Sequence, residues 1–544
     1  MNGHITPMKT PIEVLSLYPP HDGTLKGLVA SRAQRDPARP FLIFKDRTWS
    51  WGEFQKGVDD TARMLAGQGI GRGERVAVMA TNSDRFVLMF FALARLGAVL
   101  VPINPDFGPA EAGYVLNHAG AAAVACTAAT LAVARQASEG MARKPWFMLL
   151  EGEDPAVPGF DALLAKAPSA SLPEDVGLED ICLTMYTSGT TGFPKGVMHS
   201  QRNFVMAGEG FVERMYLQAD DRVLCILPLF HINALFYSLG GATAAGASIV
   251  FAPRFSASGF WPLVAQSGAT EVNIIAAVGN ILARRPRAEF VPGHKLVKVY
   301  GAPVTQEIYD AFRKDFGVPT IIEGYGMTEI PGACNLPFTG PHKIGSMGRP
   351  ALHPDRSIRF AELRVVDDDG NEVADGETGE LLVRTPIVMK GYYKDPEQTA
   401  AAFRDGWFVT GDLVRREPDG FYHFVARKKD IIRKRGENIS GAELDRIIGE
   451  HPGVMEAAAI AVPSELGEDE ILVAVVPRPG AKVEAADIRD WCEQRLAAIK
   501  VPRYVVFAES LPQTPTHRVA KFKLKADKAL LSTAIDLNTL KKGK

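Results

Sequence analysis

The sequence has few cysteines and almost no net charge. Its five cysteines (Cys126, Cys182, Cys225, Cys334 and Cys492) include no CxxC pair, so neither a disulfide framework nor a zinc cluster is expected, and a reducing cytoplasm is the simplest location. Lysine and arginine number 61 against 63 acidic residues, which gives a formal net charge of −2. This balance argues against a nucleic-acid partner, and a stacked-aromatic motif for one is also missing.

No segment has the composition of a signal peptide or a membrane span. Residues 1–17 lack a basic region followed by an apolar stretch and a small-residue cleavage site. Of two apolar stretches, residues 86–94 are too few to cross a bilayer, and residues 223–253 contain Pro228, His231 and Asn233. Both are expected to be buried core elements, and peripheral membrane contact through an exposed apolar patch stays open as an alternative.

What is present is the composition of a large globular protein with several domains. Of its 544 residues, 46% are hydrophobic and 23% are charged, which allows a large buried core. From about residue 25 to residue 326, helix-period segments alternate with short apolar runs, the pattern of an α/β fold in which helices cover parallel sheets. One helical stripe consists of Trp51, Phe54, Val58, Ala62 and Leu65. Strands are expected at residues 75–80, 181–185, 223–227, 248–252, 271–277 and 296–300.

The pattern changes in the last third of the chain. Short β runs with Asp-Gly turns at residues 369–370 and 419–420 predict a β subdomain at about 357–425. After a basic run at residues 427–435, strands are expected at 457–462 and 471–476, and a helix at 485–499. We therefore expect layered α/β sheets with a β subdomain, followed by a smaller α+β domain.

The most informative segment is a loop rich in glycine and hydroxyl side chains. Residues 186–196 read YTSGTTGFPKG and directly follow the apolar run 181–185. Such a loop exposes backbone N–H groups that bind phosphate oxygens, and Lys195 adds a positive charge. It differs from the nucleoside triphosphatase pattern GxxxxGK[ST], because Pro194 precedes the lysine and Gly196 follows it. A flexible surface connection is the alternative interpretation.

With its companion motifs, this loop resembles the adenylate-forming superfamily of acyl-CoA synthetases, aryl-CoA ligases, firefly luciferase and peptide-synthetase adenylation domains. The motifs occur in family order over nearly the whole chain: LPLFH at 227–231, YGAP at 300–303, EGYGMTE at 323–329, GEL at 379–381, TGD at 410–412 and the basic run from 427 to 436. The resemblance implies that ATP, Mg²⁺ and CoA are used.

The resemblance also implies the nucleotide site. A carboxylate must be held against the α-phosphate of ATP, so Thr328 is implied at that phosphate and Glu329 as the magnesium ligand. Tyr325 is implied to stack on adenine, and Asp412 and Arg427 to bind the ribose. By residue type alone, the Thr-Glu pair could cap a helix, the tyrosine could be a core residue and the aspartate could form a turn. The other implied ATP-binding residues are Thr187, Ser188, Gly189, Thr190, Thr191, Gly192, Lys195, Gly301, Ala302, Pro303, Glu323, Gly324, Gly326 and Met327.

His231 is implied to orient the carboxylate between the acid and the nucleotide. Without the resemblance, a histidine in this apolar segment would be interpreted as a core residue. The expected acyl pocket consists of Phe230, His231, Ala234, Ala276, Val278 and Pro331. The small side chains at Ala276 and Ala277 favour room for a bulky acid.

The basic run 427–435 is implied to contain a hinge at Lys429, about which a small domain rotates between two half-reactions. Boundaries of 1–428 for the N-terminal adenylation domain and 429–544 for a mobile C-terminal domain follow from this position. Arg433 is implied to be catalytic in the second half-reaction, and with Gly436 it is implied to bind CoA. On charge alone, a solvated face is the ordinary interpretation of such a run.

One motif near the C-terminus departs from the family. Residues 511–518 read LPQTPTHR, so His517 replaces the usual glycine and Arg518 replaces the usual lysine that bridges the carboxylate and the α-phosphate. Arginine is larger and planar, but it keeps the charge. We expect Arg518 to act as a charge clamp that lysine acetylation cannot inactivate. Lys521 is the poorer candidate.

The predicted activity is that of an ATP-dependent acid–CoA ligase that forms acyl-AMP and pyrophosphate, then an acyl-CoA thioester. Two alternatives stay open: an adenylating ligase that loads a separate carrier protein, and a weakly catalytic acyl-adenylate-binding protein. The acid is not determined by the sequence, because fatty, aromatic, steroid side-chain and carnitine-like acids all remain candidates. A homodimer is the default expectation.

Overall fold

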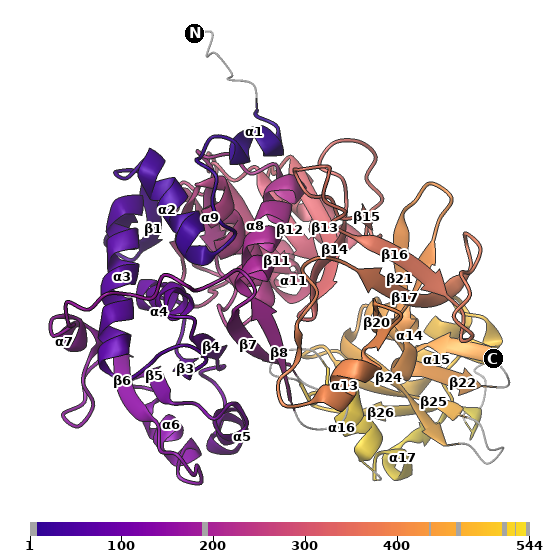
Figure 1. Ribbon diagram of the computed structural model, residues 1–544. Coiled ribbons are helices and arrows are strands. Elements are labelled where there is room, and N and C mark those ends of the chain that lie inside the picture. Colours follow the sequence, from indigo (N-terminus) through magenta and orange to yellow (C-terminus); the bar gives the residue numbers. More distant parts are fainter. Residues whose placement is uncertain are drawn as a thin grey trace. The chain divides into compact units, whose positions relative to one another are not determined.

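A computed structural model describes residues 8–187, 194–434, 437–463, 469–513, 519–527 and 529–539 (Figure 1). The described chain forms two compact units. The first holds the described residues before 364 together with Val383–Phe408, and the second holds Arg364–Leu382 and the described residues from 409 onward. The predicted fold class is confirmed: layered α/β sheets form the larger, N-terminal part and an α+β arrangement the C-terminal part. The predicted boundaries at 428/429 and the β subdomain at about 357–425 stay predictions.

The larger sheet of the first unit has nine strands in the order β15-β14-β13-β12-β11-β9-β10-β1-β2. Neighbours from β1 to β13 along this order are parallel, whereas β2, β14 and β15 are antiparallel additions at the edges. Its strands are β1 (Pro40–Phe44), β2 (Arg47–Ser50), β9 (Arg222–Cys225), β10 (Ser248–Phe251), β11 (Glu271–Ile275), β12 (Lys298–Ala302), β13 (Thr320–Met327), β14 (Ile330–Asn335) and β15 (Arg349–Pro350).

A second sheet in the first unit has seven strands in the order β18-β8-β7-β4-β3-β5-β6. Strands β7, β4, β3, β5 and β6 are parallel to their neighbours, and β8 and β18 continue the sheet antiparallel. The strands are β3 (Arg75–Met79), β4 (Val99–Pro102), β5 (Ala123–Thr127), β6 (Trp146–Glu151), β7 (Ile181–Thr187), β8 (Lys195–Ser200) and β18 (Gly391–Tyr392).

Helices pack against these sheets through continuous apolar faces. The predicted stripe lies on α3 (Trp51–Gly67), and all five of its residues are buried. The helix begins with a capping box, in which the Ser50 hydroxyl accepts from the backbone N–H of Glu53 and the Glu53 carboxylate accepts from that of Ser50. The others named below are α2 (Leu25–Arg35), α4 (Asp84–Arg95), α5 (Pro109–Ala119), α8 (Gln201–Met215), the π-helix η1 (Asn233–Leu239), α11 (Ala276–Arg284) and α13 (Pro396–Ala401).

Both apolar stretches of the sequence are core elements, as predicted. Residues 86–94 form the buried middle of α4, and residues 223–253 pass through β9, η1 and β10. In the described part of the chain, no helix combines the length and apolar character that a membrane crossing requires.

The second unit contains most of a mainly antiparallel sheet in the order β16-β17-β20-β19, with β21 also paired to β20. A hairpin and a four-stranded sheet, β24-β25-β26-β27, follow it. Alternate residues of β24 and β25 belong to two separate apolar clusters, because successive side chains of a strand point to opposite faces. The bounds are β16 (Glu362–Val366), β17 (Thr378–Arg384), β19 (Phe403–Arg404), β20 (Trp407–Arg416), β21 (Tyr422–Arg427), η4 (Lys428–Asp430), β22 (Ile431–Lys434), β23 (Glu437–Ser440), α14 (Gly441–Gly449), β24 (Val454–Pro463), β25 (Asp469–Pro477), α15 (Ala485–Glu493), β26 (Tyr504–Phe507), α16 (Lys521–Ala526) and β27 (Ile535–Asp536).

Some predicted elements were too long, among them one strand and one helix. The strand predicted at 271–277 ends at Ile275, and Ala276 begins α11. The helix predicted at 485–499 ends at Glu493, because Ala497 is extended and a separate short 3₁₀ turn follows at Ala498–Lys500. Leu496 and Ile499 still pack on the apolar cluster that contains Ile488 and Cys492. The periodicity therefore predicted which side chains are buried, but it did not predict where the helix ends.

Candidate active site

The glycine-rich loop joins two strands of the seven-stranded sheet. Thr187 is the last residue of β7 and Lys195 the first of β8, and the two are register partners. The stems of the loop are fixed by α5, because the Tyr114 hydroxyl donates to the Pro194 carbonyl (3.1 Å) and His118 Nδ1 lies 2.7 Å from the Tyr186 hydroxyl. The predicted phosphate-binding residues Ser188, Gly189, Thr190, Thr191 and Gly192 lie outside the described residues.

Lys195 and Glu329 are joined through a side chain that the sequence analysis did not identify. Tyr392 lies in β18, which pairs with β8, and its ring centroid is 4.8 Å from Lys195 Nζ. The Tyr392 hydroxyl donates to Glu329 Oε1 at 3.0 Å. Burial and the neighbouring carboxylate raise the pKa of Tyr392, so its phenol stays protonated and able to donate. The site thus holds a cation, a phenol donor and a carboxylate side by side.

Thr328 and Glu329 form the turn between β13 and β14, not the start of a helix, so the helix-cap interpretation is wrong. A second hydrogen-bond chain fixes the backbone of this turn. His199 on β8 is fully buried, and its Nε2–H donates to the Thr328 carbonyl at 2.7 Å. Its Nδ1 accepts from Asn203 at 2.8 Å, and Asn203 also donates to the Val388 carbonyl.

His199 is therefore a neutral imidazole with one fixed tautomer. A carbonyl oxygen can only accept, so the proton must be on Nε2. Burial lowers the pKa of His199 to about 4. The Met389 backbone N–H donates to the Glu329 carbonyl at 2.8 Å, so two segments hold the turn: His199 on β8 holds Thr328, and the segment just before Tyr392 holds Glu329.

The predicted adenine-binding residues lie at the same ends of neighbouring parallel strands. Gly301 at the end of β12 is the register partner of Glu323 on β13, and Tyr325 follows on β13, half-buried and not in the core. Glu323 is buried, its Oε2 accepts from the Gly345 backbone N–H at 3.2 Å, and burial raises its pKa to about 7. Ala302 is the last residue of β12 and Pro303 follows it, and Gly324, Gly326 and Met327 belong to β13. The carboxyl ends of parallel strands are where α/β sheets commonly bind ligands.

The predicted acyl residues are divided among three segments of the first unit. Phe230 and His231 lie between β9 and η1 with ring centroids 4.5 Å apart, and His231 is half-buried, so it is not a fully enclosed core residue. Ala234 is buried in η1, Ala276 and Val278 are in the first turn of α11, and Pro331 is buried in β14.

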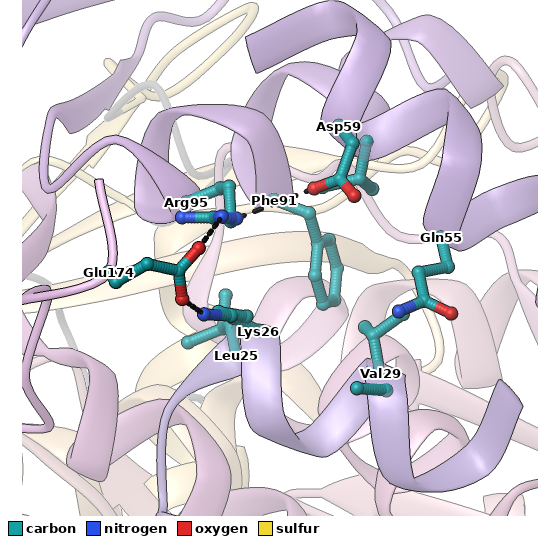
Figure 2. A pocket seen from close by; sticks show the side chains of 10 residues that line it. Leu25, Lys26, Val29, Gln55, Asp59, Phe91, Arg95 and Glu174 are labelled. Carbon is teal, nitrogen blue, oxygen red and sulfur yellow. Dashed lines mark hydrogen bonds and ion pairs between the residues drawn. The ribbon is translucent and has the colours of Figure 1, made fainter. Parts of the chain in front are cut away.

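A cavity of about 340 Å³ lies apart from all of these residues, among α2, α3 and α4 (Figure 2). Its charged side chains neutralise one another: Glu174 pairs with Lys26 and, at 2.9 Å, with Arg95, which also pairs with Asp59 at 3.4 Å. The remaining lining residues are Leu25, Val29, Ala30, Gln55, Val58 and Phe91. Its charge is balanced internally, so we do not assign it to the nucleotide.

In the second unit, Asp412 and Arg427 form an ion pair. They are register partners on β20 and β21, and Arg427 Nε lies 3.2 Å from Asp412 Oδ1. The aspartate is 1% exposed and belongs to a strand, so its interpretation as a turn residue is wrong. Its backbone N–H donates to the Thr410 hydroxyl at 3.0 Å, which fixes the start of the TGD motif.

The basic run is not a uniform solvated face. Lys428 pairs with Glu380 (3.1 Å) and Asp368 (2.8 Å), and Lys434 pairs with Glu470 at 2.6 Å. Lys429 lies in η4, where its carbonyl accepts from Lys525 at 3.2 Å. Arg433 is exposed on β22. The predicted residues Gly436, His517 and Arg518 lie outside the described residues. Lys521 forms an ion pair with Asp445 at 2.5 Å.

The residues present fit a magnesium ion most of whose ligands come from a nucleotide and water. In the described ranges, no group of three or more His, Cys, Asp or Glu side chains is placed to enclose a metal. Magnesium in phosphoryl-transfer sites needs only one or two protein carboxylates, since phosphates and water supply the other ligands. Glu329, at a turn beside a lysine, is suited to that part.

The fold and this arrangement define an α/β nucleotide-using enzyme, and comparison with known proteins identifies its family. The family model described as AMP-binding enzyme matches residues 29–393, and the model described as AMP-binding enzyme C-terminal domain matches residues 443–518. The chain belongs to the AMP-binding enzyme family.

Relatives and solved structures agree with this assignment. The chain is 34% identical to a sulfoacetate–CoA ligase of Cupriavidus necator over 92% of this chain and 97% of that one. It is 31% identical to an oxalate–CoA ligase of Arabidopsis thaliana, over 92% and 97%. The crystal structure of ATP-bound MatB from Rhodopseudomonas palustris superposes with a TM-score of 0.80 at 27% identity, covering 92% of this chain and 98% of that one. The predicted activity is confirmed at the level of reaction: the protein is an AMP-forming acid–CoA ligase that uses ATP, Mg²⁺ and CoA.

Proposed function

We propose that adenylation takes place at the turn formed by Thr328 and Glu329, opposite Lys195. The observation that carries this proposal is the Lys195–Tyr392–Glu329 arrangement, in which the cation lies over the phenol ring and the carboxylate accepts from its hydroxyl. The substrate carboxylate attacks the α-phosphorus of ATP, a C–O–P anhydride bond forms, and the bond to pyrophosphate breaks. Lys195 and the loop before it hold the phosphate charge, and Thr328 contacts the α-phosphate.

Glu329 would hold the magnesium ion, which neutralises phosphate charge when it is bound. Tyr392 orients the Glu329 carboxylate, because a hydrogen bond to Oε1 restricts the direction in which Oε2 points. Tyr325 and the segment 301–303 contact the adenine. The edge of the adenine site is formed by Glu323, Gly324, Gly326 and Met327. Asp412 and Arg427 bind the ribose.

His231 orients the attacking carboxylate, and Phe230, Ala234, Ala276, Val278 and Pro331 surround the acyl group. In the second half-reaction the CoA thiolate attacks the acyl carbon, a thioester forms and AMP leaves with the electron pair. Arg433 and Gly436 serve CoA, Lys429 is the hinge that separates residues 1–428 from 429–544, and Arg518 clamps the charge during adenylation.

The acid itself is open to direct assay. The named relatives act on sulfoacetate and oxalate, two short acids that carry a second anionic group. A panel of carboxylic acids incubated with ATP, Mg²⁺ and CoA, with thioesters read by mass, tests the proposed activity. Thioester and AMP in equal amounts are expected for at least one acid, and absence of thioester with every acid contradicts the proposal.

We further propose that the enzyme works in the cytoplasm as a homodimer. All five cysteines are buried and unpaired, as in proteins that fold under reducing conditions. Cell fractionation tests the location, and light scattering of the purified protein tests the oligomer.

A further inference from the structure

Arg214 is a buried arginine in an aromatic cage next to the proposed acyl residues. It lies in the last turn of α8 and is 3% exposed. Its guanidinium carbon lies 4.9 Å from the ring centroid of Tyr237, 5.2 Å from that of Tyr300 and 5.7 Å from that of Phe211. These faces stabilise a cation and fix its plane.

The charge of Arg214 is not neutralised by a carboxylate among the residues that the structure describes. Its hydrogen bonds are long ones to neutral groups, 3.4 Å to the Tyr300 hydroxyl and 3.4 Å to Asn335 Oδ1. Two other buried cations of this unit are paired with carboxylates, Arg95 with Glu174 and Lys298 with Asp221 at 2.6 Å, and buried Arg32 donates to two backbone carbonyls. A buried, unpaired charge is costly, so a compensating anion is expected.

The guanidinium occupies the space of a missing side chain on the β13–β14 hairpin. A Cβ atom on Gly332 would lie 2.1 Å from Arg214 Nη2, and one on Gly326 would lie 2.9 Å from the Tyr237 hydroxyl. Gly332 follows Pro331 directly, and Tyr237 lies one turn after Ala234 in η1. The cation therefore contacts two of the segments, β14 and η1, that carry residues proposed to surround the acyl group.

Beyond the aromatic cage, polar side chains lie on the strand next to that of Tyr300, and such a face does not suit an alkyl chain. Asn273 on β11 is the register partner of Tyr300 on β12. Its amide donates to Ser238 and Asn233 at 2.9 Å each, and its Oδ1, although 1% exposed, has no hydrogen-bond partner. Hydroxyl, amide and guanidinium groups thus gather on one face of the sheet beneath η1.

We infer that Arg214 is a specificity-determining residue that binds a second anionic group of the acid, so that the preferred substrates are short dicarboxylic or sulfonated acids. This inference rests on the proposed placement of the acyl group. A planar guanidinium pairs with both oxygens of a carboxylate or two of a sulfonate, which gives the far end of the acid a fixed direction. A monoacid of equal length leaves the buried cation unpaired, so its binding free energy is less favourable.

The test compares acids of matched length in the complete enzyme. Oxalate to adipate and sulfoacetate are assayed against acetate to hexanoate, with decanoate and benzoate included, by kcat/KM for thioester formation. The wild type is expected to prefer at least one dianionic acid over its monoacid counterpart by about 10- to 100-fold, the size of a charge-assisted hydrogen bond. Arg214→Met should remove that preference by slowing the dianionic acid, and Arg214→Lys should restore part of it.

Arg32→Met is the matched control. Arg32 is also buried and lies over an aromatic ring, 4.4 Å from that of Tyr18, but it donates to the Thr243 and Ala244 carbonyls. This variant should lose stability and keep the acid preference. A wild type that prefers monoacids, or an Arg214→Met variant that slows all acids equally, overturns the role of Arg214 as a specificity residue while the proposed function stands. Only the absence of thioester with every acid overturns the proposed function.

Discussion

The hydroxyl of Tyr392 lies 3.0 Å from Oε1 of Glu329, and the same ring faces Lys195. Tyr392 is 63 positions from the glutamate in the chain, yet it contacts both charges that we propose to serve adenylation. Its contact gives the carboxylate one defined hydrogen-bond donor before any ligand binds.

Removing that donor should weaken catalysis without abolishing it. Tyr392→Phe is expected to lower kcat/KM for ATP by about 3- to 10-fold, the effect of one hydrogen bond on a charged group. Steady-state kinetics at several magnesium concentrations measures this effect. Tyr393→Phe, one residue further on, is the control and should change nothing. Equal loss in both variants would mean that the hydroxyl of Tyr392 has no specific role.

His199 should make the protein sensitive to acid. Its folded-state pKa of about 4 is below its ordinary value of 6.5, so the unfolded chain takes up a proton first as the pH falls. Titration of His199 leaves the free energy of unfolding unchanged above pH 6.5. It lowers that free energy as the pH falls from 6.5 toward 4, by at most about 1.4 kcal/mol per pH unit.

His199→Gln removes the titrating group but keeps a side-chain donor for the Thr328 carbonyl. Thermal unfolding at pH 7.5 and pH 5 should show a smaller drop in midpoint for the variant than for the wild type. Identical drops in the two proteins contradict the neutral, buried state of this imidazole.

The Asp412–Arg427 pair should act on nucleotide affinity. Asp412→Asn is expected to raise KM for ATP about 10-fold, with a smaller change in kcat, because a ribose contact is made in both ground and transition states. Asp445→Asn breaks another ion pair of this unit, that with Lys521, and should lower stability and leave KM unchanged. A change in kcat alone for Asp412→Asn would place the residue outside the ribose site.

Arg518, which departs from the lysine of the family, should still be required for adenylation. Arg518→Ala is expected to slow acyl-adenylate formation about 100-fold, because a cation beside the reacting phosphate is lost. Single-turnover formation of the adenylate measures this step. Treatment with a lysine acetyltransferase should leave the wild type active and inactivate Arg518→Lys. Unchanged adenylate formation by Arg518→Ala contradicts the clamp.

The sequence was most informative where one short segment carries the chemistry. The strings around Lys195 and Glu329 and the alternation of helix and strand predicted the fold class and the reaction, because these signals are local. Tyr392, His199 and Arg214 were not identified, since their importance comes from partners far along the chain: His199 contacts a carbonyl 129 residues away, and Arg214 contacts Tyr300, 86 residues away. Nothing in the residues next to them indicates these contacts.

Element ends were predicted less well for a related reason. Periodicity reports which side chains are buried, and Leu496 and Ile499 are indeed packed in the apolar cluster. The helix ends at Glu493, before these two residues, so the burial pattern extends beyond the end of the helix. Ala276, predicted as a strand residue, is apolar and half-buried, which suits the start of a helix equally well.

The most direct test of the account is ATP–pyrophosphate exchange by Glu329→Gln, measured over a range of magnesium concentrations with an acid that the wild type uses. The variant keeps the size and the hydrogen bond to Tyr392 but loses the charge. Exchange is expected to fall at least about 100-fold and to need more magnesium, whereas Glu397→Gln on α13 should match the wild type. Wild-type exchange with wild-type magnesium dependence in Glu329→Gln would contradict the placement of adenylation at this turn.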